Sequence, residues 1–221
     1  MKNFDNLDIQ SKKILILVPV CDEELNLSFV IDELKSELPD IDLLIINDGS
    51  SDNSLNIIKN SNVQYINIPL NIGYSLAIQT GYKYALDKNY DYLIQFDGDR
   101  QHIASEAKRM LQIAISDDAD LVLGSRFMGN NNSDYPLFRR IGKNIMCYLI
   151  KIICQRVITD PTSGFQIINN KLLNYLGKIN YFPQFADANL IIDIILKRYT
   201  VIELAIDMRP REFGKSMYYG L

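Results

Sequence analysis

The chain has 221 residues and a mass of 25.4 kDa, which favours one large domain over two small ones. Its 48% of hydrophobic and 23% of charged residues are ordinary for a protein with a packed core, and they exclude a disordered or fibrous chain. The formal net charge of −4 argues against general nucleic-acid binding, which usually requires a basic face.

The sequence lacks the patterns of disulfide-rich, zinc-binding, secreted and membrane-spanning proteins, so we expect it to belong to none of these classes. The cysteines have no paired spacing, so we expect neither a disulfide framework nor a zinc site. Residues 1–13 are polar and do not have the pattern of a secretory signal. No uncharged apolar run reaches about 18 residues, the length that a membrane-spanning helix needs. We therefore expect a soluble, cytoplasmic protein that does not bind nucleic acid.

Apolar runs alternate with helix-like stretches through the first half of the chain. The run at 14–20 (ILILVPV) is continuous and rich in β-branched residues, as expected for a parallel strand covered on both faces. Similar runs predict further strands at 41–48, 63–69, 90–99 and 119–127. Helical spacing and capping residues predict helices at 23–38, 50–60 and 74–86. In the last helix, Ala77, Gly81 and Ala85 form a stripe of small residues that permits close packing.

This alternation predicts an α/β fold, with a mostly parallel central sheet and helices on both faces. Ligands of such sheets bind beyond the carboxyl ends of the strands. Asp48, Asp97 and Arg126 each lie at or just past the end of a predicted strand. We therefore expect these three side chains to face one crevice.

The second half of the chain is less regular and contains a basic helix. A polar loop at 129–136 precedes a long helix through Cys154, and a turn, a helix, a strand at 201–208 and a basic tail follow. Residues 135–159 contain no carboxylate; their basic residues are Arg139, Arg140, Lys143, Lys151 and Arg156. A basic amphipathic helix can lie on an anionic membrane surface, here the cytoplasmic face, or it can be a core helix with a polar edge.

The strongest local signal is the segment FDGDRQH at 96–102. Asp97 and Asp99 are two carboxylates where a strand breaks into a loop, and together they can share one divalent cation. Mg²⁺ and Mn²⁺ prefer oxygen ligands and often combine one or two carboxylates with phosphate and water. The alternative is a plain turn, because Asp-Gly is a favoured turn pair. We interpret His102, the only histidine, as a structural part of this turn.

A second aspartate, Asp48, ends the strand in NDGSSDNS at 47–54. A carboxylate at this place can accept hydrogen bonds from a nucleobase or a ribose. The alternative is a turn that caps the helix after it.

Seven motifs in order carry a resemblance to a known family. They are VPVCDEE (18–24), NDGSSD (47–52), NIGYSLAIQTGYKYA (71–85), FDGDRQH (96–102), GSRF (124–127), DPTSGF (160–165) and MRPREFGKSM (208–217). This set resembles the inverting family 2 glycosyltransferases, and among them the polyprenyl-phosphate sugar synthase-like branch. The resemblance spans about Ile14 to Met217. It implies a GT-A fold, a nucleotide-diphosphate sugar donor, and Mg²⁺ or Mn²⁺ as cofactor.

The resemblance also implies roles for individual residues. Pro19 and Glu23 line the nucleoside pocket, and Asp48 holds the base or ribose. Asp97 and Asp99 form the DxD pair on the metal and the diphosphate, with Gln101 beside them. The residues that face phosphate groups are Arg126, Arg139 or Arg140, and Arg211, with Ser216 in the closing R-x-x-G-x-S segment. Met217 stands where lysine is frequent in the family, with Lys215 two positions earlier.

Two residues are candidates for the transfer step itself. Arg211 can stabilise the charge that develops on a diphosphate leaving group, because guanidinium forks match phosphate oxygens. Asp187, before the late helix, is the candidate general base for a hydroxyl acceptor; it can equally be a helix N-cap. A phosphate acceptor is already anionic and needs no such base.

We therefore predict a metal-dependent inverting glycosyltransferase of the hexosyltransferase type. The acceptor is either a polyprenyl phosphate or a cell-envelope glycan precursor, and contact with the membrane or a membrane protein partner would deliver it. The predicted single domain covers 1–221, with a polar extension at 1–13, a nucleotide-binding half at 14–127 and an acceptor-side half at 128–221.

Three other functions compete with this one. A phosphohydrolase with an aspartate nucleophile would need a threonine soon after the DxD pair, where Arg100, Gln101 and His102 stand. A sugar nucleotidyltransferase would need a glycine-rich N-terminal loop with a basic residue, which is missing. A non-catalytic nucleotide-sugar-binding subunit would not need both Asp97 and Asp99.

Overall fold

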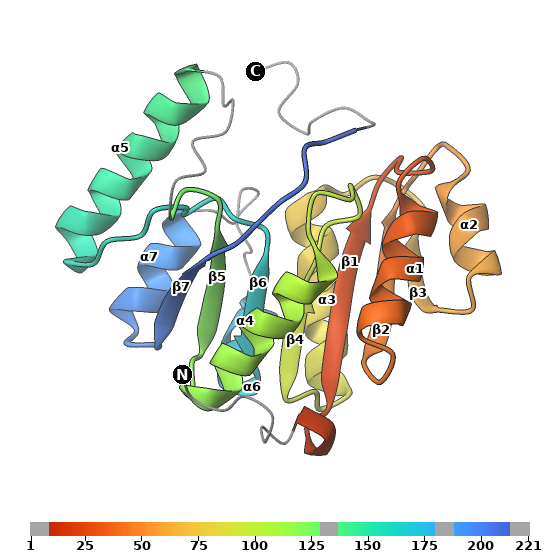
Figure 1. The fold of residues 1–221 in the computed structure, drawn as a ribbon, viewed down its shortest axis with the longest axis horizontal. Helices are drawn as coiled ribbons and strands as arrows, with labels where there is room; N and C mark the ends of the chain where they lie inside the picture. Colours follow the sequence, from red (N-terminus) through yellow and green to blue (C-terminus); the bar gives the residue numbers. More distant parts are fainter. Residues whose placement is uncertain (1–8, 129–136, 180–187, 213–221) are drawn as a thin grey trace.

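The computed structural model describes residues 9–128, 137–179 and 188–212. Its core is one seven-stranded sheet in the order β3-β2-β1-β4-β6-β5-β7 (Figure 1). The strands are β1 (Ile14–Val20), β2 (Asp42–Asp48), β3 (Gln64–Ile68), β4 (Tyr92–Gln95), β5 (Leu121–Ser125), β6 (Gln166–Asn169) and β7 (Val201–Ala205). All the pairings are parallel except those of β6, which runs antiparallel to both β4 and β5. The predicted α/β fold with a mostly parallel sheet is confirmed.

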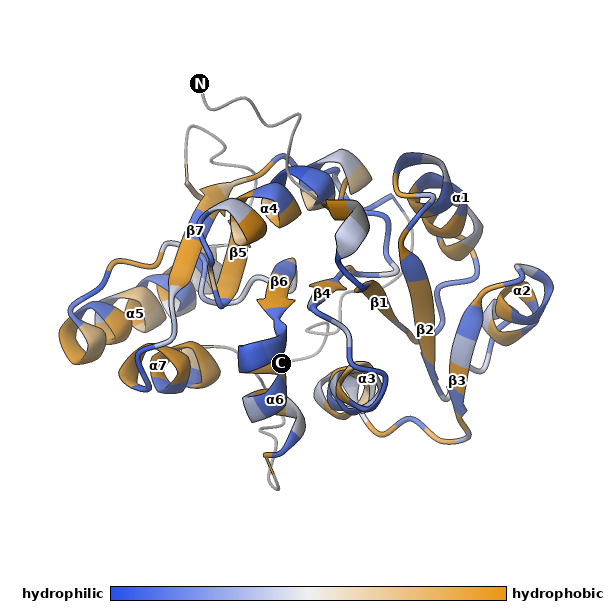
Figure 2. Cartoon of the chain, turned by 90° about the horizontal axis from the view of Figure 1, so that it is seen from below, coloured by the Kyte–Doolittle hydropathy of each residue, from blue (hydrophilic) through white to orange (hydrophobic). Residues whose placement is uncertain are grey.

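Helices cover both faces of the sheet (Figure 2). On one face lie α1 (Leu27–Glu37), α2 (Ser54–Asn60) and α4 (Ala104–Ser116). On the other lie α3 (Tyr74–Asp87), α5 (Leu137–Cys154), α6 (Asn170–Gly177) and α7 (Ala188–Leu196). The strand β1 shows why its sequence is apolar throughout: Ile14, Ile16 and Val18 belong to the first layer, whereas Leu15 and Leu17 belong to the second.

Close packing of α3 on β1 depends on the predicted stripe of small residues. Ala77 and Ala85 are fully buried. A Cβ atom added at Gly81 would lie 2.3 Å from Cδ1 of Leu17, so a side chain there would force Leu17 or the helix to shift. The prediction for this stripe is confirmed.

The short strand β6 was not predicted. It has only four residues and directly follows the turn at 160–164, so it shows no periodicity of its own; its place is fixed by pairing with β4 and β5. Because β6 runs against its neighbours, its amino end lies at the carboxyl ends of the parallel strands. The turn at 160–164 is therefore brought to the same edge of the sheet as Asp97 and Arg126.

At the opposite end of the sheet, Asp120 joins three strands through hydrogen bonds. Its Oδ2 accepts from the backbone N–H of Thr200 (2.7 Å) and from Nζ of Lys171 (3.0 Å), and its Oδ1 accepts from Nδ2 of Asn169 (2.9 Å). Burial raises the pKa of Asp120, but these hydrogen bonds have the larger effect and hold it below its usual value. Its stabilising effect is therefore complete above the unfolded pKa of about 3.9 and is lost as the pH falls through the lower folded pKa.

We expect Asp120→Asn to lower the free energy of unfolding by about 1–3 kcal/mol at pH 7, because an amide nitrogen would face buried donors. Urea denaturation of the variant and the wild type would measure this difference, and it should shrink as the pH is lowered toward 3. The exposed Asp40→Asn is the control and should change little. An equal effect of both variants would contradict the assigned role of Asp120.

Candidate functional site

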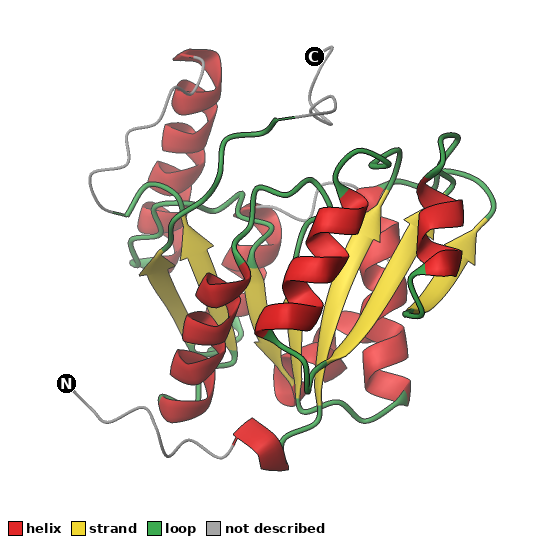
Figure 3. Ribbon diagram, turned by 45° about the vertical axis from the view of Figure 1, so that its right-hand side comes forward, coloured by secondary structure: helices red, strands yellow, loops and turns green. Residues whose placement is uncertain are grey.

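The candidate site lies along the carboxyl ends of the parallel strands, where their loops gather at the upper edge of the molecule (Figure 3). Asp48 is the last residue of β2, Asp97 and Asp99 follow β4, and Arg126 follows β5. The segment after β7, residues 206–212 and here called the closing segment, crosses the same edge toward β1 (Figure 1). The segments that carry these residues are far apart in the sequence and meet at this edge of the sheet, which is the place of the expected crevice.

Asp97 is held from two sides. Its Oδ1 accepts a hydrogen bond from Oη of Tyr74 (2.7 Å), and its Oδ2 lies 3.5 Å from Nε2 of His102. Burial raises the pKa of Asp97, against the hydrogen bond from Tyr74 and the positive charges of Arg126 and Arg211. This half-buried carboxylate therefore carries a negative charge that its neighbours compensate only in part.

His102 has the structural role interpreted from the sequence. Its Nδ1 accepts the backbone N–H of Asp97 (3.0 Å), and its ring stacks on Phe165 with centroids 4.3 Å apart. Burial lowers the pKa of His102 to about 4, so the ring is neutral at physiological pH and carries its hydrogen on Nε2.

Asp99 shares one guanidinium with Glu23. Nη2 of Arg211 donates to Oδ2 of Asp99 (2.8 Å) and lies 3.3 Å from Oε1 of Glu23. Burial, and then the negative charge of Asp97, raise the pKa of Asp99; burial also raises that of Glu23. Within the described residues, Nε of Arg211 is buried without a hydrogen-bond partner. The structure thus brings together three of the predicted residues, Glu23, Asp99 and Arg211.

The closing segment is anchored by residues that the sequence analysis missed. Arg209 forms a double hydrogen bond with Glu33 of α1 (2.7 and 2.9 Å), and its backbone N–H donates to the carbonyl of Gln101 (2.9 Å). Oε1 of Glu33 also accepts the N–H of Ala104 at the start of α4. Burial raises the pKa of Glu33, but these hydrogen bonds together have the larger effect and hold it below its usual value. No spacing in the sequence pairs Glu33 with Arg209, because they are 176 positions apart.

Arg126, predicted to face phosphate, is paired with a buried carboxylate. Its Nε and Nη2 donate to the two side-chain oxygens of Asp160 (2.7 and 2.8 Å), and Nη2 also donates to Oγ1 of Thr162 (3.0 Å). Asp160 is fully buried, and its motif DPTSGF gave no sign of this pairing. The ion pair joins the end of β5 to the turn before β6.

Asp48 and Pro19 support the walls of the crevice. The two side-chain oxygens of Asp48 accept the backbone N–H groups of Ile72 (2.8 Å) and Gly73 (3.0 Å), which fixes the start of α3. Pro19 is buried in β1, and a Cβ atom added at Gly98 would lie 3.3 Å from its carbonyl oxygen. The glycine between the two carboxylates therefore allows the DxD loop to lie against β1.

The residues at this edge fit a divalent cation. Across the part of the chain that the structure describes, no three His, Cys, Asp or Glu side chains form a ready-made cluster. Asp97 and Asp99 nevertheless offer hard oxygen ligands, and the raised pKa of each marks negative charge that lacks full compensation. Mg²⁺ is commonly held by one or two carboxylates together with phosphates and water, so a protein cluster of three is not required.

Some predicted residues lie outside this description. Asp187 and Ser216 fall beyond the described residues, as does the side chain of Arg139. Arg140 is exposed on α5, which lies at the crevice end of the sheet (Figure 1). Gln101 lies beside the DxD pair as predicted: its N–H donates to Oδ1 of Asp99 (3.1 Å).

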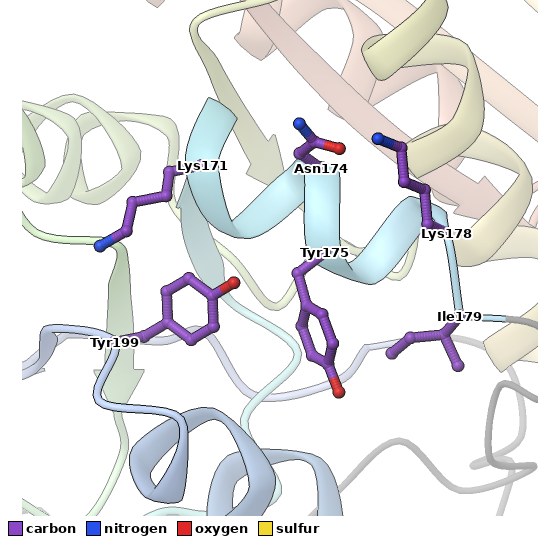
Figure 4. A pocket seen from close by; sticks show the side chains of 6 residues that line it. All are labelled: Lys171, Asn174, Tyr175, Lys178, Ile179 and Tyr199. Atoms are coloured by element: carbon purple, nitrogen blue, oxygen red, sulfur yellow. The ribbon is translucent and has the colours of Figure 1, made fainter.

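A separate pocket of about 460 Å³ lies at the opposite end of the sheet. Figure 4 shows its six lining residues, which come from α6, the residues just after it and Tyr199 before β7. The rings of Tyr175 and Tyr199 stack with centroids 5.9 Å apart, and Lys171 is already paired with Asp120. None of the predicted site residues lines this pocket.

The strand order and the carboxylate pair beyond β4 place the protein in the class of GT-A glycosyltransferases. The chain matches the family model of glycosyl transferase family 2 over residues 15–177 and belongs to that family. The family resemblance drawn from the seven motifs is confirmed.

Three relatives show the range of sequences that are similar to this chain. An uncharacterized protein of Methanocaldococcus jannaschii is 29% identical over 72% of this chain, which spans 65% of that protein's length. The polyprenol monophosphomannose synthase of Mycolicibacterium smegmatis is 23% identical, over 95% of this chain and 82% of that protein. The UDP-N-acetylglucosamine–dolichyl-phosphate N-acetylglucosaminyltransferase of Methanococcus voltae is 26% identical, over 76% of this chain and 73% of its own length.

Among solved structures, the chain resembles the glucosyl-3-phosphoglycerate synthase of Mycobacterium tuberculosis in complex with Mn²⁺, UDP and phosphoglyceric acid. The TM-score is 0.72 and the identity 15%, over 93% of this chain and 72% of that one. At this identity the likeness establishes the shared fold alone.

The anchoring of the closing segment can be tested by hydrogen exchange. We expect Arg209→Met to speed amide exchange in residues 207–212, because it removes the double hydrogen bond to Glu33. The matched control is Arg100→Met, which removes the more exposed pair with Glu212 at the same segment and should have a small effect. Mass spectrometry of the peptides that cover this segment would compare the two variants, and unchanged exchange in Arg209→Met would contradict the anchor.

Proposed function

We propose that the protein is a metal-dependent inverting glycosyltransferase that moves one sugar from a nucleotide-diphosphate donor to a polyprenyl phosphate. The observation that carries this proposal is the half-buried pair Asp97 and Asp99 after β4, with Arg211 hydrogen-bonded to Asp99 at the carboxyl edge of the sheet. The names of the relatives from M. smegmatis and M. voltae support a polyprenyl-type phosphate as acceptor. A cell-envelope glycan precursor is the alternative acceptor.

Asp97 and Asp99 would hold Mg²⁺ or Mn²⁺, which supplies positive charge against the leaving diphosphate. The other residues of the crevice then have distinct tasks. Asp48 already accepts two backbone N–H groups, but a carboxylate has about four acceptor positions, so it can also accept from the nucleoside. Pro19, Glu23 and Gln101 would line the donor site beside it.

The arginines would bind phosphate groups. Nε of Arg211, which has no hydrogen-bond partner among the described residues, would donate to a phosphate oxygen, while Nη2 lies beside the negative charge of Asp99. Arg126 is fixed by Asp160, so its charge stays beside Asp97 without the entropy cost of ordering a free side chain. Arg139 or Arg140, with Ser216, would face the phosphate of the acceptor. A phosphate acceptor needs no general base, so Asp187 becomes important only if the acceptor is a hydroxyl.

A polyprenyl acceptor requires access to a membrane surface, and α5 supports this. Its outer face carries a cluster of apolar residues that are each 46% or more exposed: Ile141, Ile145, Tyr148, Leu149, Ile152 and Ile153, continued by Val157. Ile150 is fully buried, and α5 packs on α7. One side of α5 therefore packs against the core, and the other side is an exposed apolar face.

The charge around this face favours an anionic bilayer as its partner. The exposed basic residues Arg140, Lys151 and Arg156 lie on or just after α5, and residues 135–159 contain no carboxylate. Among the described helices, none is long and apolar enough to cross a membrane. We therefore propose that α5 lies along the lipid surface, with the crevice opening at the same end of the molecule.

The metal assignment predicts that Asp99→Asn weakens Mn²⁺-dependent nucleotide binding about tenfold or more, because an amide is a much poorer ligand than a carboxylate. Isothermal titration of UDP and GDP with and without Mn²⁺ would measure this. Asp42→Asn, which alters a carboxylate at the amino end of β2, is the control and should bind normally. Unchanged Mn²⁺-dependent affinity in Asp99→Asn would remove Asp99 from the metal site.

The membrane assignment predicts that the protein floats with vesicles rich in anionic lipid, and less so in high salt. Lys143→Glu with Lys151→Glu should reduce flotation, because each basic residue near the surface contributes about 1 kcal/mol. Ile145→Ser with Ile152→Ser should reduce it by removing apolar contact. The control for the apolar pair is Tyr65→Ser with Leu76→Ser, two exposed residues on β3 and α3. Failure of the wild type to float at low salt would contradict membrane contact through α5.

A further inference from the structure

A chain of hydrogen bonds leads from the interior of the protein to Asp97. Oη of Tyr82 donates to Oε1 of Gln95 (2.8 Å), and Nε2 of Gln95 donates to Oη of Tyr74 (3.1 Å). Oη of Tyr74 then donates to Oδ1 of Asp97 (2.7 Å). The directions are fixed: the amide nitrogen of Gln95 can only donate, so the hydrogen of Tyr74 points to the carboxylate.

The inner two members of this chain are buried, which holds them in place. Tyr82 and Gln95 are 2% and 3% exposed. Gln95 ends β4, whereas Tyr74 is the first residue of α3, whose start is itself fixed by Asp48. Two elements therefore set the position of the Tyr74 hydroxyl before any ligand binds.

His102 holds Asp97 from the other side. Its Nδ1 accepts the backbone N–H of Asp97, so the ring hydrogen is on Nε2, which lies 3.5 Å from Oδ2. The ring cannot turn away, because it stacks on Phe165 and meets the edge of Phe96 with centroids 5.2 Å apart. Oδ1 and the backbone N–H of Asp97 are thus held by hydrogen bonds, and the His102 ring lies beside Oδ2.

Gly164 closes this arrangement from the turn before β6. A Cβ atom added there would lie 2.9 Å from Oη of Tyr74 and 3.0 Å from Oδ2 of Asp97. The backbone of the turn therefore lies directly against the pair formed by Tyr74 and Asp97. Any side chain at position 164 would have to displace one of these two atoms.

We propose that Tyr74 and His102 are positioning residues, which fix the orientation of the Asp97 carboxylate for the divalent cation. This inference rests on the proposed function, because it presumes that Asp97 is a metal ligand. A carboxylate that is already oriented loses less conformational freedom on binding a cation. Groups that hydrogen-bond to a ligand typically change metal affinity 10–100-fold when they are removed.

The test compares Tyr74→Phe with the wild type in titrations of UDP and GDP, each in Mn²⁺ and in EDTA. Tyr74→Phe should weaken binding in Mn²⁺ about tenfold, within the range seen for residues that support a metal ligand, and leave binding in EDTA unchanged. Tyr90→Phe is the matched control, because it removes a tyrosine hydroxyl from a carboxylate, Asp42, at a similar distance of 2.8 Å but far from the crevice. Tyr90→Phe should lower the free energy of unfolding without changing the ratio of the nucleotide affinity in Mn²⁺ to that in EDTA.

A second variant keeps the inference testable if Tyr74→Phe does not fold. Gly164→Ala retains every hydrogen-bonding group but crowds the Tyr74 hydroxyl, and it should lower the same Mn²⁺-specific affinity. A ratio of affinities equal to that of the wild type in either folded variant would overturn the positioning role. If the wild type binds nucleotide with the same affinity in Mn²⁺ and in EDTA, the proposed metal site is wrong, and the positioning role is wrong with it.

Discussion

Clustered, half-buried negative charge after β4 is the constraint on which the rest of the crevice depends. Asp97 and Asp99 lie two residues apart, Glu23 lies close to Asp99 through Arg211, and burial raises the pKa of all three carboxylates. Burying a carboxylate is costly unless it is paired and hydrogen-bonded. The compensation here comes from Arg126 at the end of β5 and Arg211 in the closing segment, both far from the aspartates in sequence. The crevice is therefore stable only when β5, β6 and the closing segment are in place.

The sequence predicted the elements whose apolar pattern is strong and continuous. The run at 14–20 became β1 without change of bounds, and the helix expected at 74–86 is α3 with one further residue. The strand β6 escaped prediction because four residues carry no periodicity, and its antiparallel direction comes from pairing with β4 and β5. The predicted helix at 23–38 begins four residues later, because residues 23–26 turn to meet the loop at 50–54.

The candidate site was predictable only as far as residue types indicate chemistry. Two aspartates at i and i+2 after a strand can share a cation or form a plain turn. The cation site is favoured because Asp48 and Arg126 were expected at the same edge of the sheet. The partners could not be predicted: Asp160 for Arg126, Glu33 for Arg209, and Tyr74 for Asp97 each depend on elements that meet only in the folded chain. A hydroxyl at the start of a helix has no distinctive spacing to a carboxylate 23 positions later.

Arg211 and a divalent cation would both interact with the same atom, Oδ2 of Asp99. Nη2 of Arg211 lies 2.8 Å from Oδ2 of Asp99, and the remaining part of its guanidinium includes a buried Nε without a partner among the described residues. A cation on Asp99 would compete with this hydrogen bond, and the displaced guanidinium would still need an anion. A diphosphate that arrives with the cation supplies one, since guanidinium groups match phosphate oxygens well. The cation and the diphosphate would thus bind together. Arg211 would then pair with a phosphate in place of the Asp99 carboxylate, and neither charge would be left without a partner. The anchor at Arg209 and Glu33 keeps Arg211 within reach of both partners, because it fixes the backbone two residues earlier.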